Sequence, residues 1–76
     1  MEVLTMKVSP RGLWVYITIN LAKNDNFKIV NYDDLPEEVI NKLRQLAYQP
    51  NALNVVNKLI SDQPTYEVLL ERIMML

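Results

Sequence analysis

The sequence predicts an α+β fold, with a three-stranded antiparallel meander in residues 1–32 packed against two to three helices in residues 34–76. In the N-terminal half, apolar residues alternate with a period of two, which is typical of half-buried strands. In the C-terminal half they recur at spacings of three and four, which is typical of amphipathic helices. A chain of 76 residues has the length of one domain, so residues 1–76 are interpreted as a single unit.

The clearest predicted strand covers residues 13–21, which are dominated by β-branched and aromatic side chains. Successive side chains of a strand point to opposite faces of the sheet. One alternating set is therefore expected to face the core, namely Leu13, Val15, Ile17, Ile19 and Leu21. The other set, which includes Trp14 and Tyr16, is expected to face away from it.

Two weaker strands flank this one, at residues 2–8 and residues 27–32. Ser9-Pro10-Arg11-Gly12 matches a type I turn, with proline at the second position and glycine at the fourth. This turn predicts a hairpin between the first two strands. The polar cluster Lys23-Asn24-Asp25-Asn26 predicts a second turn before the third strand.

Three helices are predicted in the C-terminal half. Asp34-Leu35-Pro36-Glu37 matches a capping box at the start of the first. Asn51 is expected to cap the second, and the third runs from about Pro64 to the end. The carboxylates of Asp33, Asp34, Glu37 and Glu38 are interpreted as a helix N-terminus, which favours negative charge, rather than as a cation site.

The composition excludes several kinds of catalytic site. The chain has no cysteine and no histidine, so Ser–His pairs, Cys–His pairs and zinc sites with sulfur or imidazole ligands are absent. Its one glycine is too few for a glycine-rich phosphate loop. Ser9 and Ser61 both fall at predicted turns or helix ends. We therefore expect no enzymatic activity, no catalytic residue, no cofactor and no metal.

The outward face of the predicted sheet is one candidate surface for binding a partner. Aromatic residues and lysines gather there, and they could form a protein interface, stack nucleic-acid bases, or be covered by helices as core residues. Nucleic acid is the least favoured of these partners, because the pI is near 5.2 and nucleic-acid binders are usually basic. The residues of this face are Lys7, Trp14, Tyr16, Thr18, Lys28 and Tyr32.

The last predicted helix is a second candidate surface. It is broadly apolar, and its polar residues are Glu67, Glu71 and Arg72. This acidic character argues against a DNA-recognition helix and against a helix lying on a membrane surface. Homodimer formation through this helix is the preferred interpretation, and the residues expected to carry it are Tyr66, Leu69, Leu70, Ile73, Met74 and Leu76.

These observations together predict a small, non-enzymatic protein-binding module of the adaptor or inhibitor type. The alternative is a single-strand nucleic-acid binder that uses the aromatic and lysine face. The sequence shows neither a signal peptide nor a membrane span, so a cytoplasmic location is expected. The abundance of Asn, Ile and Tyr fits an AT-rich genome, such as that of a low-GC bacterium or of a phage acting in its host's cytoplasm.

Overall fold

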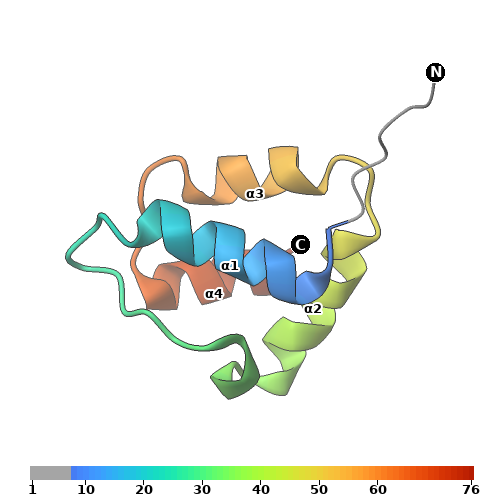
Figure 1. Ribbon diagram of the computed structural model, residues 1–76, viewed down its shortest axis with the longest axis horizontal. Helices are drawn as coiled ribbons and strands as arrows, with labels where there is room; N and C mark the ends of the chain where they lie inside the picture. Colours follow the sequence, from blue (N-terminus) through green and yellow to red (C-terminus); the bar gives the residue numbers. More distant parts are fainter. Residues whose placement is uncertain (1–7) are drawn as a thin grey trace.

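The computed structural model describes residues 8–76, which form four α-helices and one short 3-10 helix (Figure 1). The described residues contain no strand, so the predicted meander is wrong and this part of the chain is a small helical domain. The elements are α1 at Pro10–Leu21, η1 at Tyr32–Asp34, α2 at Glu37–Ala47, α3 at Ala52–Ile60 and α4 at Tyr66–Met74.

Helix α1 occupies the segment that was predicted to be the central strand. The Ser9 hydroxyl accepts a hydrogen bond from the Gly12 backbone N–H at 3.0 Å, and Pro10 takes the first helical position. Serine before a helix and proline at its first position satisfy or remove N–H groups that would otherwise lack partners. Ser9-Pro10-Arg11-Gly12 is therefore a helix start, and the predicted hairpin turn is wrong.

The buried side of α1 follows helical spacing rather than alternation. Leu13, Trp14, Ile17 and Leu21 are all at most 2% exposed. Val15 and Ile19 were expected in the core but are 48% and 64% exposed. The alternating pattern was misleading because Leu13, Ile17 and Leu21 are spaced four apart, which fits a period of two and a helical period equally well.

Residues 22–36 form a long connection between α1 and α2, and the strand predicted at residues 27–32 is absent. Phe27 is buried and its ring meets that of Tyr66 edge-on, with the ring centroids 6.3 Å apart. The connection therefore packs against the start of α4. The strand predicted for residues 2–8 lies outside the described residues except for Val8, which is in no strand.

The three helices predicted in the C-terminal half correspond to α2, α3 and α4. The predicted capping box is wrong, because Asp34 ends η1 and Pro36, with no capping side chain, precedes the first residue of α2. Asn51 takes the N-cap position of α3, but its side chain makes no capping hydrogen bond. Thr65 caps α4 by accepting a hydrogen bond from the Val68 N–H at 3.3 Å.

The four helices pack around one apolar core. Helix α1 contacts both α2 and α3, and α4 contacts the same two helices. Figure 1 shows α1 at the front of the molecule, with α3 along one side of it and α4 behind it. The described residues include no buried polar side chain. Apart from the α1 residues and Phe27, the core comprises Leu35, Val39, Leu43, Leu46, Ala52, Val56, Ile60, Leu69 and Ile73.

Candidate functional site

Trp14, the central residue of the predicted sheet face, is part of the core. It is 2% exposed, and its indole N–H donates a hydrogen bond to the Val30 carbonyl oxygen at 2.6 Å. This bond satisfies the polar end of a buried indole and fastens the connection after α1 to that helix. Trp14 is therefore unavailable to a partner, in agreement with the core interpretation.

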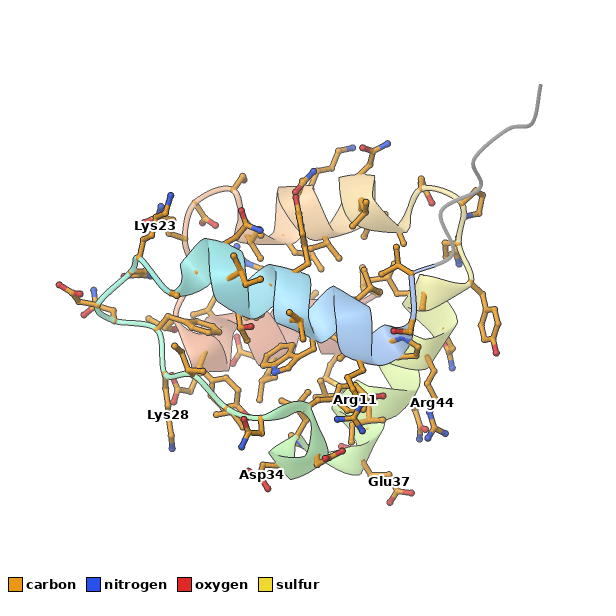
Figure 2. The ribbon with its side chains drawn as sticks, viewed as in Figure 1. Arg11, Lys23, Lys28, Asp34, Glu37 and Arg44 are labelled. Atoms are coloured by element: carbon orange, nitrogen blue, oxygen red, sulfur yellow. The ribbon has the colours of Figure 1, made fainter. Side chains whose placement is uncertain are left out.

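The other members of that predicted face are spread over different parts of the molecule. The Tyr16 hydroxyl donates a hydrogen bond to the Asn57 side chain on α3 at 2.6 Å, and Thr18 bonds the backbone of its own helix. Tyr32 lies under the Arg11 guanidinium, 4.8 Å from the ring centroid. Lys28 is exposed on the connection after α1 (Figure 2). Lys7 lies outside the described residues.

Because alternation along a strand was the reason for grouping these residues, their shared face is not formed. Among the aromatic residues of this set, Trp14 is buried and Tyr16 and Tyr32 are only partly exposed. Trp14, Tyr16 and Tyr32 therefore do not form the shared outward face that the sequence predicted.

Helix α4 uses part of its apolar surface in the core. Leu69 and Ile73 are fully buried, and Tyr66 and Leu70 are partly buried. Met74 and Leu76, the other two residues predicted to carry self-association, are 39% and 48% exposed. The large apolar residues left exposed in and after α4 are Val68 near its start and Met74, Met75 and Leu76 at and beyond its C-terminal end.

That end of α4 forms one wall of a groove, and the start of α2 forms the other. The groove has a volume of about 450 Å³, within the range of small-molecule and peptide-side-chain pockets. Most of its lining side chains are apolar. The lining residues are Pro36, Glu38, Val39, Leu70, Glu71, Met74 and Met75.

The groove has a carboxylate on each wall, Glu38 on α2 and Glu71 on α4. Both side chains belong to exposed residues, and neither forms an ion pair within residues 8–76. Glu37 and Glu67 extend the negative charge along the two helices, because they lie beside Glu38 and one turn before Glu71. The groove is thus apolar at its floor and acidic at its edges.

Tyr66, at the start of α4, lies outside the groove and is influenced by two other carboxylates. Partial burial raises the pKa of the Tyr66 hydroxyl above its ordinary value, and the charges of Glu67 and Asp34 raise that pKa further. A neighbouring carboxylate raises a phenol's pKa because it opposes formation of the phenolate. Asp34 of η1 and Glu67 of α4 are therefore close enough to act on one side chain.

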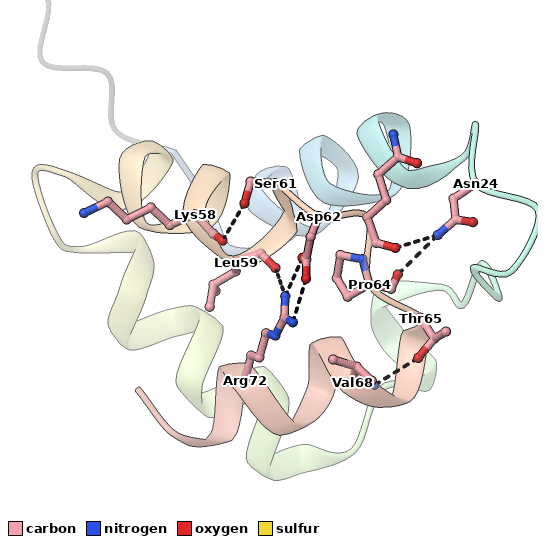
Figure 3. Close-up of polar contacts among 10 residues, drawn as sticks. Asn24, Lys58, Leu59, Ser61, Asp62, Pro64, Thr65, Val68 and Arg72 are labelled. Carbon is pink, nitrogen blue, oxygen red and sulfur yellow. Dashed lines mark hydrogen bonds and ion pairs between the residues drawn. The ribbon is translucent and has the colours of Figure 1, made fainter.

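Arg72 fixes α4 against the end of α3 (Figure 3). Its guanidinium donates to both carboxylate oxygens of Asp62, at 2.7 and 2.9 Å, and to the Leu59 carbonyl oxygen at 2.9 Å. Such two-pronged bonds restrict geometry as well as adding attraction. The hydrogen bond from Arg72 lowers the pKa of Asp62 and raises that of Arg72. This pair holds the helix that supplies one wall of the groove.

Four other polar contacts hold local structure together. Ser9 caps α1, and the Ser61 hydroxyl donates to the Lys58 carbonyl oxygen at 3.3 Å. Arg11 pairs with Asp33 at 2.9 Å, in an exposed bridge near the start of α1. Asn24 donates to the Gln63 carbonyl oxygen at 2.8 Å, which ties the first connection to the turn before α4 (Figure 3).

Sequence reasoning identified Met74 and Leu70 but missed the other wall of the groove. Pro36, Glu38 and Val39 were interpreted only as a helix start and its apolar stripe. Their spacing along the chain gives no sign that they lie beside residues more than thirty positions later. One signal was present in the sequence, namely the two acidic segments at residues 33–38 and 67–71. The fold brings one carboxylate from each segment to the groove.

Comparisons with protein-family models, curated proteins and solved structures find no match to this chain. Within the described range, no helix is long and apolar enough to cross a membrane. Residues 8–76 also contain no group of three or more acidic side chains arranged to hold a metal ion.

Proposed function

We propose that this chain is a non-enzymatic protein-binding module that holds a segment of its partner in the groove between α2 and α4. The observation that carries the proposal is the exposed apolar lining at the end of α4, which faces Val39 and Pro36 across the groove. Apolar surface that stays open to water on a small domain is typical of an interaction site. An adaptor or an inhibitor would use such a site, and the cysteine-free sequence fits action in a reducing compartment such as the cytoplasm.

The side chains of Met74 and Met75 suit this role. Methionine is unbranched and polarisable, so it adapts to the shape of an incoming side chain more readily than valine or isoleucine. Met75 is 85% exposed and Met74 is 39% exposed. Both therefore have apolar surface that a partner can cover.

Self-association through α4, which the sequence predicts, is a competing use of the same surface. A two-fold dimer uses the same surface patch on both copies. A dimer built on this surface would bring Glu38, Glu67 and Glu71 of both copies into one interface, and like charges brought close together repel. This charge pattern favours a different protein as the partner.

The test is selection of binding peptides from a random displayed library with the purified chain. The selected peptides should bind a variant carrying both Met74→Ser and Met75→Ser roughly tenfold more weakly, because the apolar contacts are lost while the net charge is kept. Val15→Ser is the matched control, since Val15 is 48% exposed on α1. This variant should bind as the unaltered chain does.

Two outcomes would contradict the proposal. One is a library that yields no binding peptide. The other is a set of peptides whose affinity falls with Val15→Ser and not with the methionine substitutions. Circular dichroism of all three proteins checks that they are folded, and light scattering on each establishes whether Met74 and Met75 support a dimer instead.

A further inference from the structure

We infer that the groove between α2 and α4 takes a basic amphipathic segment, in which apolar side chains enter the groove and lysine or arginine side chains reach its two edges. The inference rests on the proposed function and names the chemistry of the partner. A helical segment with apolar residues spaced three and four apart is the form that fits a groove between two helices.

The floor of the groove supplies the apolar half of the match. Val39 and Leu70 lie in it, with Met74 and Met75 at the end formed by α4. Val39 is 3% exposed, so its side chain is anchored in the core and gives the floor a fixed shape. The two methionines are exposed and can close over an inserted side chain.

The edges supply the charged half. Glu38 and Glu71 lie on opposite walls, so a helix in the groove would have a carboxylate on each side. Two arginines of the described structure are paired with carboxylates outside the groove, whereas Arg44 on α2 is exposed and in no ion pair. Arg72 pairs with Asp62, and Arg11 with Asp33.

Lys42 lies one turn after Glu38 on α2. Its ammonium group donates a hydrogen bond to the Leu76 carbonyl oxygen at 2.8 Å and forms no ion pair with a carboxylate among residues 8–76. This bond leaves the positive charge of Lys42 in place beside Glu38. The Glu38 and Glu71 carboxylates are in no ion pair among residues 8–76, so they are open to an external cation. Exposed opposite charges at the edge of an interface chiefly select the partner and speed its approach.

Charges of both signs lie near the start of α2. Figure 2 shows Arg11 and Arg44 on the same side of the view as Glu37, and Lys23 and Lys28 on the connection after α1. The charged residues that line the groove itself are Glu38 and Glu71. These two carboxylates are the charges that favour a basic segment over an acidic one.

The test compares three labelled helical peptides of about four turns, roughly 14 residues, by fluorescence anisotropy. The first carries leucines at groove spacing and lysines at its edges. The second has glutamate in place of every lysine, and the third has serine in place of every leucine. We expect the first to bind at least roughly tenfold more tightly than either of the others, and its affinity to fall as salt is added.

Two variants of the chain locate the effect. Glu38→Gln combined with Glu71→Gln should weaken binding of the first peptide by roughly tenfold, because two edge contacts lose their charge. Asp25→Asn is the control, since Asp25 is an exposed carboxylate on the connection after α1. That substitution should leave the affinity unchanged.

The outcomes distinguish the inference from the proposed function. The lysine and glutamate peptides could bind equally well and both lose affinity for the variant carrying Met74→Ser and Met75→Ser. That result would overturn the inference of a basic partner and would leave the groove as a binding site. Equal binding of the leucine and serine peptides overturns the docking of apolar side chains. If no peptide binds and library selection also fails, both the inference and the proposed function are wrong.

Discussion

Trp14 joins two parts of the chain that are separate in sequence. Its ring fills the core below α1, and its indole N–H bonds the Val30 carbonyl oxygen sixteen residues later. This contact gives the otherwise irregular connection a fixed position. The connection leads in turn to the start of α2, which forms one wall of the groove.

Replacing Trp14 with phenylalanine should lower the free energy of unfolding by roughly 1–3 kcal/mol, because the Val30 carbonyl oxygen loses its donor. Urea denaturation followed by circular dichroism measures the change, since the variant has no tryptophan fluorescence. Tyr48→Phe is the control, because Tyr48 is 89% exposed and should change stability by less than about 0.5 kcal/mol. Equal stability of the Trp14 variant and the unaltered chain would show that the bond is not formed.

Asp62 makes stability depend on pH in the acid range. Arg72 lowers its pKa in the folded chain, so the pair's contribution is present above the ordinary aspartate pKa of about 3.9. It is lost as the pH falls through the lowered value. We expect the thermal midpoint of the Asp62→Asn variant to fall less steeply below about pH 4 than that of the unaltered chain.

The same thermal scans on Asp25→Asn give a comparison at an exposed aspartate that forms no ion pair within residues 8–76. The thermal midpoint of Asp25→Asn should fall with decreasing pH as steeply as that of the unaltered chain. If Asp62→Asn also matches the unaltered chain, the Arg72–Asp62 bond does not persist in solution.

At the scale of the element, α1 shows how a strand-like sequence can form a helix. Its β-branched and aromatic residues favour strands when taken singly, but this preference is worth only tenths of a kcal/mol per residue in a helix. Burial of Leu13, Trp14, Ile17 and Leu21 on one side of α1 outweighs it. The Ser9-Pro10 start adds a cap that also fits a turn, so neither signal alone distinguishes the two structures.

Ile17 and Ile19 separate these structures experimentally. In α1 they point in different directions, with Ile17 fully buried and Ile19 64% exposed. Ile17→Ala should lower the free energy of unfolding by roughly 2–5 kcal/mol, and Ile19→Ala by less than about 1 kcal/mol. In a strand both side chains would share one face. Similar losses for the two variants in denaturant titrations would therefore contradict the helix.

The C-terminal helices were predictable because their apolar residues lie at helical spacing and are separated by Pro50 and Pro64. The residues at which these helices start could not be predicted exactly. Helix α2 starts after Pro36 where Asp34 was the predicted cap, and α4 starts after Thr65 where Pro64 was the predicted start. Local sequence places several acceptable caps within three residues, and packing decides among them.

For the whole molecule, the sequence indicated surplus apolar surface near the C-terminal end but not the site that contains it. The groove exists because α4 returns to the start of α2, a contact between residues 36–39 and 70–75. The packing of α4 against α2 and α3 also decides which of its residues remain exposed, because Leu69 and Ile73 are buried and Met74 is open. Periodicity describes one element at a time and does not determine such pairings.

The central claim is that the α2/α4 groove binds a partner segment. Chemical-shift mapping by NMR of the isotope-labelled chain, titrated with the leucine and lysine peptide, tests it most directly. The account predicts that the largest shifts belong to Glu38, Val39, Leu70, Glu71, Met74 and Met75. Saturable shifts centred instead on Val15 and Ile19 of α1, or no shifts at the groove residues, would contradict it.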